Sequence, residues 1–130
     1  MALRILYVED DHDLREVVEL LLKFSGRSVT GCDSAEAAWQ AVESQPFDVI
    51  ITDLTLPQAS GLELTQRLLA RNPDQWVVLC SGAATPIDCA ALGRHVRALT
   101  KPFAIEELEA LLERIEAQAR AASSDPMQAD

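Results

Sequence analysis

A small set of carboxylate, hydroxyl and ammonium side chains in this sequence could act together in chemistry. Each lies at the end of a short apolar run, and the set is Glu9, Asp10, Asp11, Asp53, Ser81 and Lys101. Carboxylates that crowd together raise one another's pKa unless a cation neutralises their charge. Mg²⁺ fits this role, because it binds a few carboxylates and retains several waters. No histidine or thiolate cluster accompanies the acids, which argues against zinc.

The same residue types suit phosphoryl transfer. Mg²⁺ with open coordination positions binds phosphate oxygens, and a carboxylate can act as a nucleophile toward phosphorus. Such transfer requires positioning and charge neutralisation rather than acid–base machinery. Mg²⁺, the Lys101 ammonium and the Ser81 hydroxyl would each contact a phosphoryl oxygen. We therefore expect a carboxylate nucleophile beside a divalent ion.

These side chains can meet only if the fold brings the ends of several strands together. Apolar runs predict strands at 3–8, 28–30, 47–52, 76–80 and 96–100. Helical periodicity predicts helices at 13–24, 33–44, 61–69 and 105–120, with only a short helix within 86–92. Asp33, with Glu36 three positions later, predicts the N-cap of the second helix.

Alternating strands and helices imply a parallel sheet that is covered by helices on both faces. Such sheets place their sites outside the carboxyl ends of the strands. Four of the five predicted strands end in a carboxylate, a hydroxyl or an ammonium group. We therefore expect one site at that edge. Helix N-caps alone would explain one acidic group, but not the full set.

Composition limits the class of protein. The chain has 130 residues, of which 48% are hydrophobic, so we expect one compact domain. Its net charge of −10 argues against direct binding to nucleic acid or an anionic membrane. The sequence lacks a signal peptide and a membrane-spanning run, so we expect a cytoplasmic protein whose three cysteines are free thiols.

From residue 3 to about 120 the chain resembles the receiver domain of two-component response regulators. The matching segments are ILYVEDD, DVIITDLTLPQASGLEL, VVLCSG and LTKPF. The second is the most specific, with an aspartate four residues before proline and eight before glycine. The resemblance implies an α/β, flavodoxin-like fold: a parallel sheet of order 2-1-3-4-5 flanked by helices. Residues 1–120 would form this domain and 121–130 a flexible tail.

The resemblance also assigns roles at the site. Asp53 would be the phosphoacceptor, and Asp10 and Asp53 would ligate Mg²⁺, for which Mn²⁺ is a possible substitute. Glu9 would act on the ion through a water, and the Thr55 backbone carbonyl would complete the site.

Ser81 would hydrogen-bond the phosphoryl group, with Ala83 nearby, and Lys101 would pair with it. The peptide bond before Pro102 would be cis. The phosphodonor would be a sensor histidine kinase or a histidine phosphotransfer protein, and the output a partner protein of unknown identity. The protein would be either a stand-alone regulator or the receiver of a hybrid kinase, and its oligomeric state is left open.

The sequence departs from the receiver pattern near its fifth strand. Receivers usually carry an aromatic switch residue three positions before the lysine, where this chain has Ala98. The segment 83–97 is also short. Two hypotheses follow: activation reorders the loop 81–86, or phosphorylation serves phosphate storage or transfer.

Three other functions are weaker. A haloacid-dehalogenase phosphatase would need a second aspartate two residues after the nucleophile, where Thr55 stands. A flavin carrier would need a phosphate-binding loop after the first strand. A pseudo-receiver that only binds proteins would not need the complete phosphoryl site. We interpret His12 as an exposed helix-start residue rather than a phosphate relay, and His95, Trp39 and Trp76 as structural.

Overall fold

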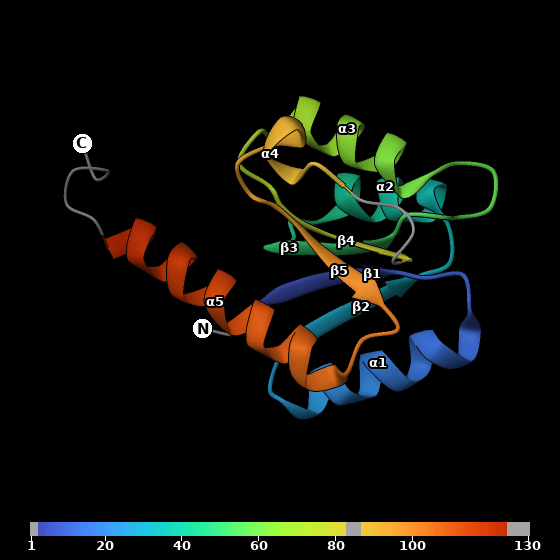
Figure 1. Ribbon diagram of the computed structural model, residues 1–130, viewed down its shortest axis with the longest axis horizontal. Coiled ribbons are helices and arrows are strands. Elements are labelled where there is room, and N and C mark those ends of the chain that lie inside the picture. Colours follow the sequence, from blue (N-terminus) through green and yellow to red (C-terminus); the bar gives the residue numbers. More distant parts are fainter. Residues whose placement is uncertain (1–2, 83–86, 125–130) are drawn as a thin grey trace.

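The computed structural model describes residues 3–82 and 87–124. Strands and helices alternate along them (Figure 1). In chain order they are β1 (Arg4–Val8), α1 (His12–Phe24), β2 (Ser28–Cys32), α2 (Ala35–Ser44), β3 (Val49–Asp53), α3 (Gly61–Arg71), β4 (Trp76–Gly82), α4 (Cys89–Leu92), β5 (Val96–Lys101) and α5 (Ile105–Ser124).

The five strands form one sheet of order β2-β1-β3-β4-β5, and every neighbouring pair is parallel. Helices α1 and α5 lie on one face of this sheet, and α2, α3 and α4 lie on the other (Figure 1). This confirms the predicted fold and strand order. The short fourth helix is also confirmed, because α4 has four residues.

A separate apolar core fills the space on each face of the sheet. Residues of β1, β3 and β4 alternate between the two faces, as expected for strands that are buried on both sides. The apolar residues of α5 that recur with helical spacing are all buried: Leu108, Leu111, Leu112 and Ile115. In α1 only Val18 and Leu22 are buried, although the apolar periodicity covers a wider arc of that helix.

Several predicted boundaries differ from those of the structure. The strands β2 and β4 and the helix α3 each end two residues later than predicted, at Cys32, Gly82 and Arg71. The N-cap of α2 is Ser34, not Asp33, because the Ser34 hydroxyl accepts the backbone N–H of Ala37 at 3.1 Å. Strand β3 begins at Val49 rather than at residue 47. Helix α5 continues to Ser124 rather than ending at residue 120, and residues 125–130 of the predicted tail lie outside the described residues.

Among the described residues no helix is long and apolar enough to cross a membrane. The thiols of Cys32, Cys80 and Cys89 are free, as expected. Burial raises the pKa of Cys80 to about 12, so this thiol stays protonated in the core at neutral pH.

Candidate functional site

The predicted site residues lie at one edge of the sheet. Glu9 and Asp10 directly follow β1, Asp53 ends β3 and Lys101 ends β5, while Ser81 lies one residue before the end of β4. The ladder register places Asp53 opposite Cys80 and Ser81 opposite Thr100. Because all strands are parallel, their carboxyl ends meet at this edge.

Three carboxylates converge there. One oxygen each from Glu9, Asp10 and Asp53 lies within 4.8 Å of the others. Glu9 is buried, Asp53 is half-buried and Asp10 is exposed, so the group is open to solvent on the Asp10 side. An all-oxygen set that is open on one side fits Mg²⁺, which prefers a few carboxylates and several waters.

Lys101 supplies the positive charge of this cluster. Its Nζ donates to Glu9 Oε1 at 2.9 Å and to Asp53 Oδ2 at 3.1 Å. Burial alone would lower the pKa of the Lys101 ammonium, but the hydrogen bonds and charges of the two carboxylates outweigh it and raise that pKa above 10.5. Lys101 is therefore protonated at neutral pH and bridges β5 to the ends of β1 and β3.

Glu9 is the most enclosed of the acids, and its side chain is only 3% exposed. Burial raises the pKa of Glu9 above 4.5, against the hydrogen bonds that it accepts from Lys101 and from the Asp11 backbone N–H. Opposite charge nearby favours the ionised form of a carboxyl group. A cation that binds at the cluster would therefore favour the carboxylate of Glu9.

Asp11, next along the chain, has a structural role. Its Oδ1 accepts the backbone N–H groups of Asp13 and Leu14 at 3.1 and 3.2 Å, which makes it the N-cap of α1. This carboxylate is therefore aimed at the helix rather than at the acidic cluster. The sequence analysis grouped Asp11 with the strand-end acids but assigned the ligand roles to its neighbours Glu9 and Asp10.

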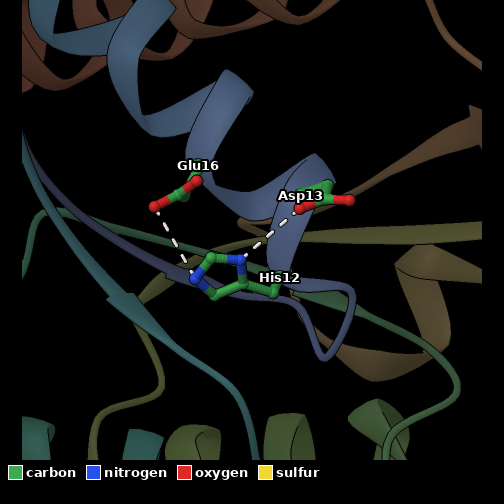
Figure 2. Close-up of side chains that lie close together, drawn as sticks. All are labelled: His12, Asp13 and Glu16. Carbon is green, nitrogen blue, oxygen red and sulfur yellow. Dashed lines mark ion pairs between the residues drawn. The ribbon is translucent and has the colours of Figure 1, made fainter.

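His12 begins α1 and is exposed. Figure 2 shows its imidazole between the carboxylates of Asp13 and Glu16, with nitrogen–oxygen distances of 3.5 and 3.6 Å. These are ion pairs only when the imidazole is protonated. The position matches an exposed helix-start histidine, as the sequence analysis expected.

Comparison with known families matches residues 5–113 to the response regulator receiver domain. The chain belongs to this family. CpdR of Brucella abortus is 31% identical over 116 residues, which make up 86% of this chain and 95% of CpdR. The regulator NtrC of Azospirillum brasilense is 33% identical over 115 residues, but the chain spans only 24% of that protein.

Solved structures support the fold. CheY4 of Vibrio cholerae superposes with a TM-score of 0.79 at 24% identity, covering 88% of this chain and 99% of CheY4. A CheY-like receiver domain from Methylobacillus flagellatus gives 0.77 at 28% identity, again over 88% of this chain.

Other receiver features are present to different degrees. The peptide bond between Lys101 and Pro102 is cis, as expected. Ser81 is buried at the carboxyl end of β4, and its contact with a phosphoryl group stays a prediction. Thr55 is exposed and its role as a carbonyl ligand also stays a prediction. Ala83 lies outside the described residues, and Ala98 is exposed on β5.

Gly61, the glycine of the most specific matching segment, is a positioning residue, a role that the sequence analysis did not give it. A Cβ at this glycine would lie 2.1 Å from the backbone oxygen of Asp53, so only glycine fits. The Gly61 N–H also donates to the Leu54 carbonyl at 2.7 Å. The start of α3 therefore packs closely against the backbone of Asp53 and Leu54. In the sequence, the spacing of eight residues between Asp53 and Gly61 indicates this glycine.

Proposed function

We propose that this receiver domain is a phosphoacceptor switch, in which Asp53 takes a phosphoryl group from a histidine kinase or a histidine phosphotransfer protein. The observation that carries the proposal is the Lys101 ammonium, which contacts Glu9 and Asp53 together. A lysine in that position can donate a hydrogen bond to an oxygen of a phosphoryl group on Asp53.

The charges of the cluster support a metal-dependent reaction. Glu9, Asp10 and Asp53 form an acidic group that Lys101 alone does not neutralise. An incoming phosphoryl group adds further negative charge. Asp10 and Asp53 would hold Mg²⁺ directly and Glu9 through a water. When bound, the ion neutralises phosphoryl oxygens as a Lewis acid.

Three side chains of the protein, Asp53, Lys101 and Ser81, would each have a separate role in the reaction. An Asp53 carboxylate oxygen forms a bond to phosphorus while the bond between phosphorus and the donor nitrogen breaks, and the donor imidazole keeps that electron pair. Lys101 moves its hydrogen bond from Asp53 Oδ2 to a phosphoryl oxygen. Ser81 donates its hydroxyl to another. The product is an acyl phosphate, which water can later hydrolyse.

The remaining parts of the proposal follow from this chemistry. The phosphorylated receiver would change its interaction with a partner protein in the cytoplasm, where sensor kinases present their phosphohistidine. The net charge of −10 makes nucleic acid and anionic membranes poor partners.

The proposal is tested by intact mass after incubation with acetyl phosphate and Mg²⁺. We expect one phosphate adduct on the wild type. We expect no adduct on the wild type when EDTA is added before the reaction, and none on Asp53→Asn. Asp33→Asn is the matched control, since it makes the same change at an exposed aspartate on another segment, and should accept phosphate as the wild type does. No adduct on folded wild type would favour a receiver that only binds proteins.

A further inference from the structure

Helix α1 carries an arginine that binds the backbone just after β1. The Arg15 Nη1 donates to the backbone carbonyl of Glu9 at 2.7 Å. Among the described residues this is the one hydrogen bond of the Arg15 guanidinium, and the group forms no ion pair with any of them. The chain has 21 acidic residues, yet this arginine pairs with a backbone carbonyl. Its role therefore concerns the backbone that it holds.

The sheet leaves the Glu9 carbonyl available for this contact. The Glu9 N–H donates to the Cys32 carbonyl at 3.0 Å, which continues the ladder between β1 and β2 by one bond. Strand β2 ends at Cys32, and Ser34, two residues later, is already the N-cap of α2. The ladder stops there, so Arg15 supplies the donor that a longer strand would have given.

Gly31 of β2 makes room for the Arg15 side chain. A Cβ at Gly31 would lie 3.3 Å from Arg15 Cδ and 1.3 Å from Glu19 Oε1. Arg15 and Glu19 are four residues apart on one side of α1, so both side chains lie against the backbone of β2. The half-buried Arg15 stem is therefore confined beside the strand, which keeps its guanidinium near the Glu9 carbonyl.

We propose that Arg15 is a positioning residue for a divalent cation at the acidic cluster. Its hydrogen bond holds the peptide group that joins Glu9 to Asp10, and so sets where the two carboxylates lie. Groups one step beyond the ligands orient them in many metal sites. The inference rests on the proposed function, because the cation belongs to that function.

Asp10 depends on this peptide group more than Glu9 does. The Glu9 side chain is fixed at both oxygens, since Oε1 accepts from Lys101 at 2.9 Å and Oε2 accepts the Asp11 N–H at 3.2 Å. The exposed Asp10 side chain makes no hydrogen bond to the part of the chain that the structure describes. Its place in the cluster is therefore set by the backbone that Arg15 holds.

The proposal predicts the opposite of what the charge of Arg15 alone would do. A positive group near the cluster repels a cation, so its removal would by charge alone tighten Mg²⁺ binding. Removal of a positioning group instead leaves Asp10 and Glu9 less ordered and weakens binding. The sign of the change in Mg²⁺ affinity therefore separates the two roles.

Titration of the ¹⁵N-labelled protein with MgCl₂, followed by NMR without a phosphodonor, measures this affinity. Arg15→Met keeps an unbranched stem over Gly31 but removes the donor, and should raise the dissociation constant for Mg²⁺ about tenfold. Arg15→Lys keeps a donor on a similar stem and should bind Mg²⁺ more tightly than Arg15→Met. Arg114→Met, the same change at an exposed arginine of α5, is the matched control and should bind as the wild type does.

Amide hydrogen exchange in EDTA gives a readout that needs no metal. The Asp11 N–H, which donates to Glu9 Oε2, should exchange several-fold faster in Arg15→Met than in the wild type. The amides of Ile50 and Ile51 in the buried strand β3 should keep their wild-type rates. Faster exchange at Asp11 alone shows loosening of the segment that carries the ligands rather than a loss of global stability.

The outcomes separate this inference from the proposed function. If Arg15→Met binds Mg²⁺ as tightly as the wild type or more tightly, the inference is wrong, while a wild type that still accepts phosphate keeps the proposed function. The inference also fails if Asp11 exchange is unchanged, or if Arg15→Lys binds no better than Arg15→Met. A wild type that binds no Mg²⁺ over the millimolar range overturns both the cation site and the role of Arg15.

Discussion

At the scale of single residues, ion pairs join the ends of neighbouring strands at both ends of the sheet. Lys101 bridges β1 and β3 at the carboxyl edge, and a second pair joins the same two strands at the opposite edge. There Arg4 donates through its backbone N–H, Nε and Nη2 to the Asp48 carboxylate at 2.8, 3.1 and 2.9 Å. Asp48 uses its side chain in this way just before β3 begins.

The Arg4–Asp48 pair gives a prediction about pH. The hydrogen bond from the Arg4 side chain holds the pKa of Asp48 below its ordinary value of 3.8. The lowered pKa means that the carboxylate stabilises the folded state above about pH 4, and that this contribution is lost as pH falls through the folded-state pKa. Asp48→Asn should therefore be less stable than the wild type at neutral pH, with the difference shrinking in acid.

Urea denaturation at a series of pH values measures that difference. Asp33→Asn, at an exposed aspartate, is the control and should track the wild type throughout. A difference between Asp48→Asn and the wild type that stays constant down to the acid limit of folding would contradict the assignment.

At the scale of elements, local signals predict which helices and strands exist but not every end. Both Asp33 and Ser34 are good N-caps, and Glu36 favoured the first, yet the chain turns into α2 one residue later. Just before β3, the Asp48 side chain binds Arg4, which lies 44 residues away. A contact over that distance leaves no local pattern. The strand-end rule, by contrast, depends only on parallel order, which explains why the acidic cluster and Lys101 could be predicted together.

Gly61 gives a prediction for the junction of β3 and α3. Gly61→Ala must push the Asp53 carbonyl or the start of α3 aside, because backbone occupies the space of the new Cβ. We expect a loss of about 1–3 kcal/mol in the free energy of unfolding and slower phosphorylation by acetyl phosphate, since the acceptor shifts. Gly82→Ala is the matched control, because nothing lies within 4 Å of its Cβ. Equal effects of the two substitutions on stability would contradict the close approach.

At the scale of the whole molecule, a single sheet separates the apolar core on one face from that on the other, and its strands contribute residues to both. Helical periodicity matches the buried residues of α5. In α1 the apolar residues cover a wide arc of the helix, and periodicity alone does not show which part of that arc is covered by neighbouring elements. Val17 and Leu21 share the period of Val18 and Leu22 and yet are exposed. Which residues of α1 are buried depends on where α5 packs against the helix. That position is a property of the assembled fold rather than of α1 alone.

Coupling through the sheet predicts a single unfolding transition. Leu64 of α3 and Leu108 of α5 are fully buried on opposite faces. Replacing either by alanine should lower the free energy of unfolding by about 2–5 kcal/mol and move the entire transition. Calorimetry and circular dichroism check this. Leu20→Ala, at an exposed leucine, should change the free energy of unfolding by less than about 0.5 kcal/mol. Two separate transitions in either core variant would contradict the coupling.

The two tryptophans lie in different surroundings. Trp39 lies under the Arg67 guanidinium at 4.2 Å and shares a surface groove with Pro57, Gln58 and Ala59, the loop that follows Asp53. Trp76 begins β4 at the opposite edge and stacks on His95, with ring centroids 4.1 Å apart. Indole fluorescence depends on what touches the ring. The chain thus carries a built-in optical label beside the loop of its acidic cluster and a second, distant one as an internal reference.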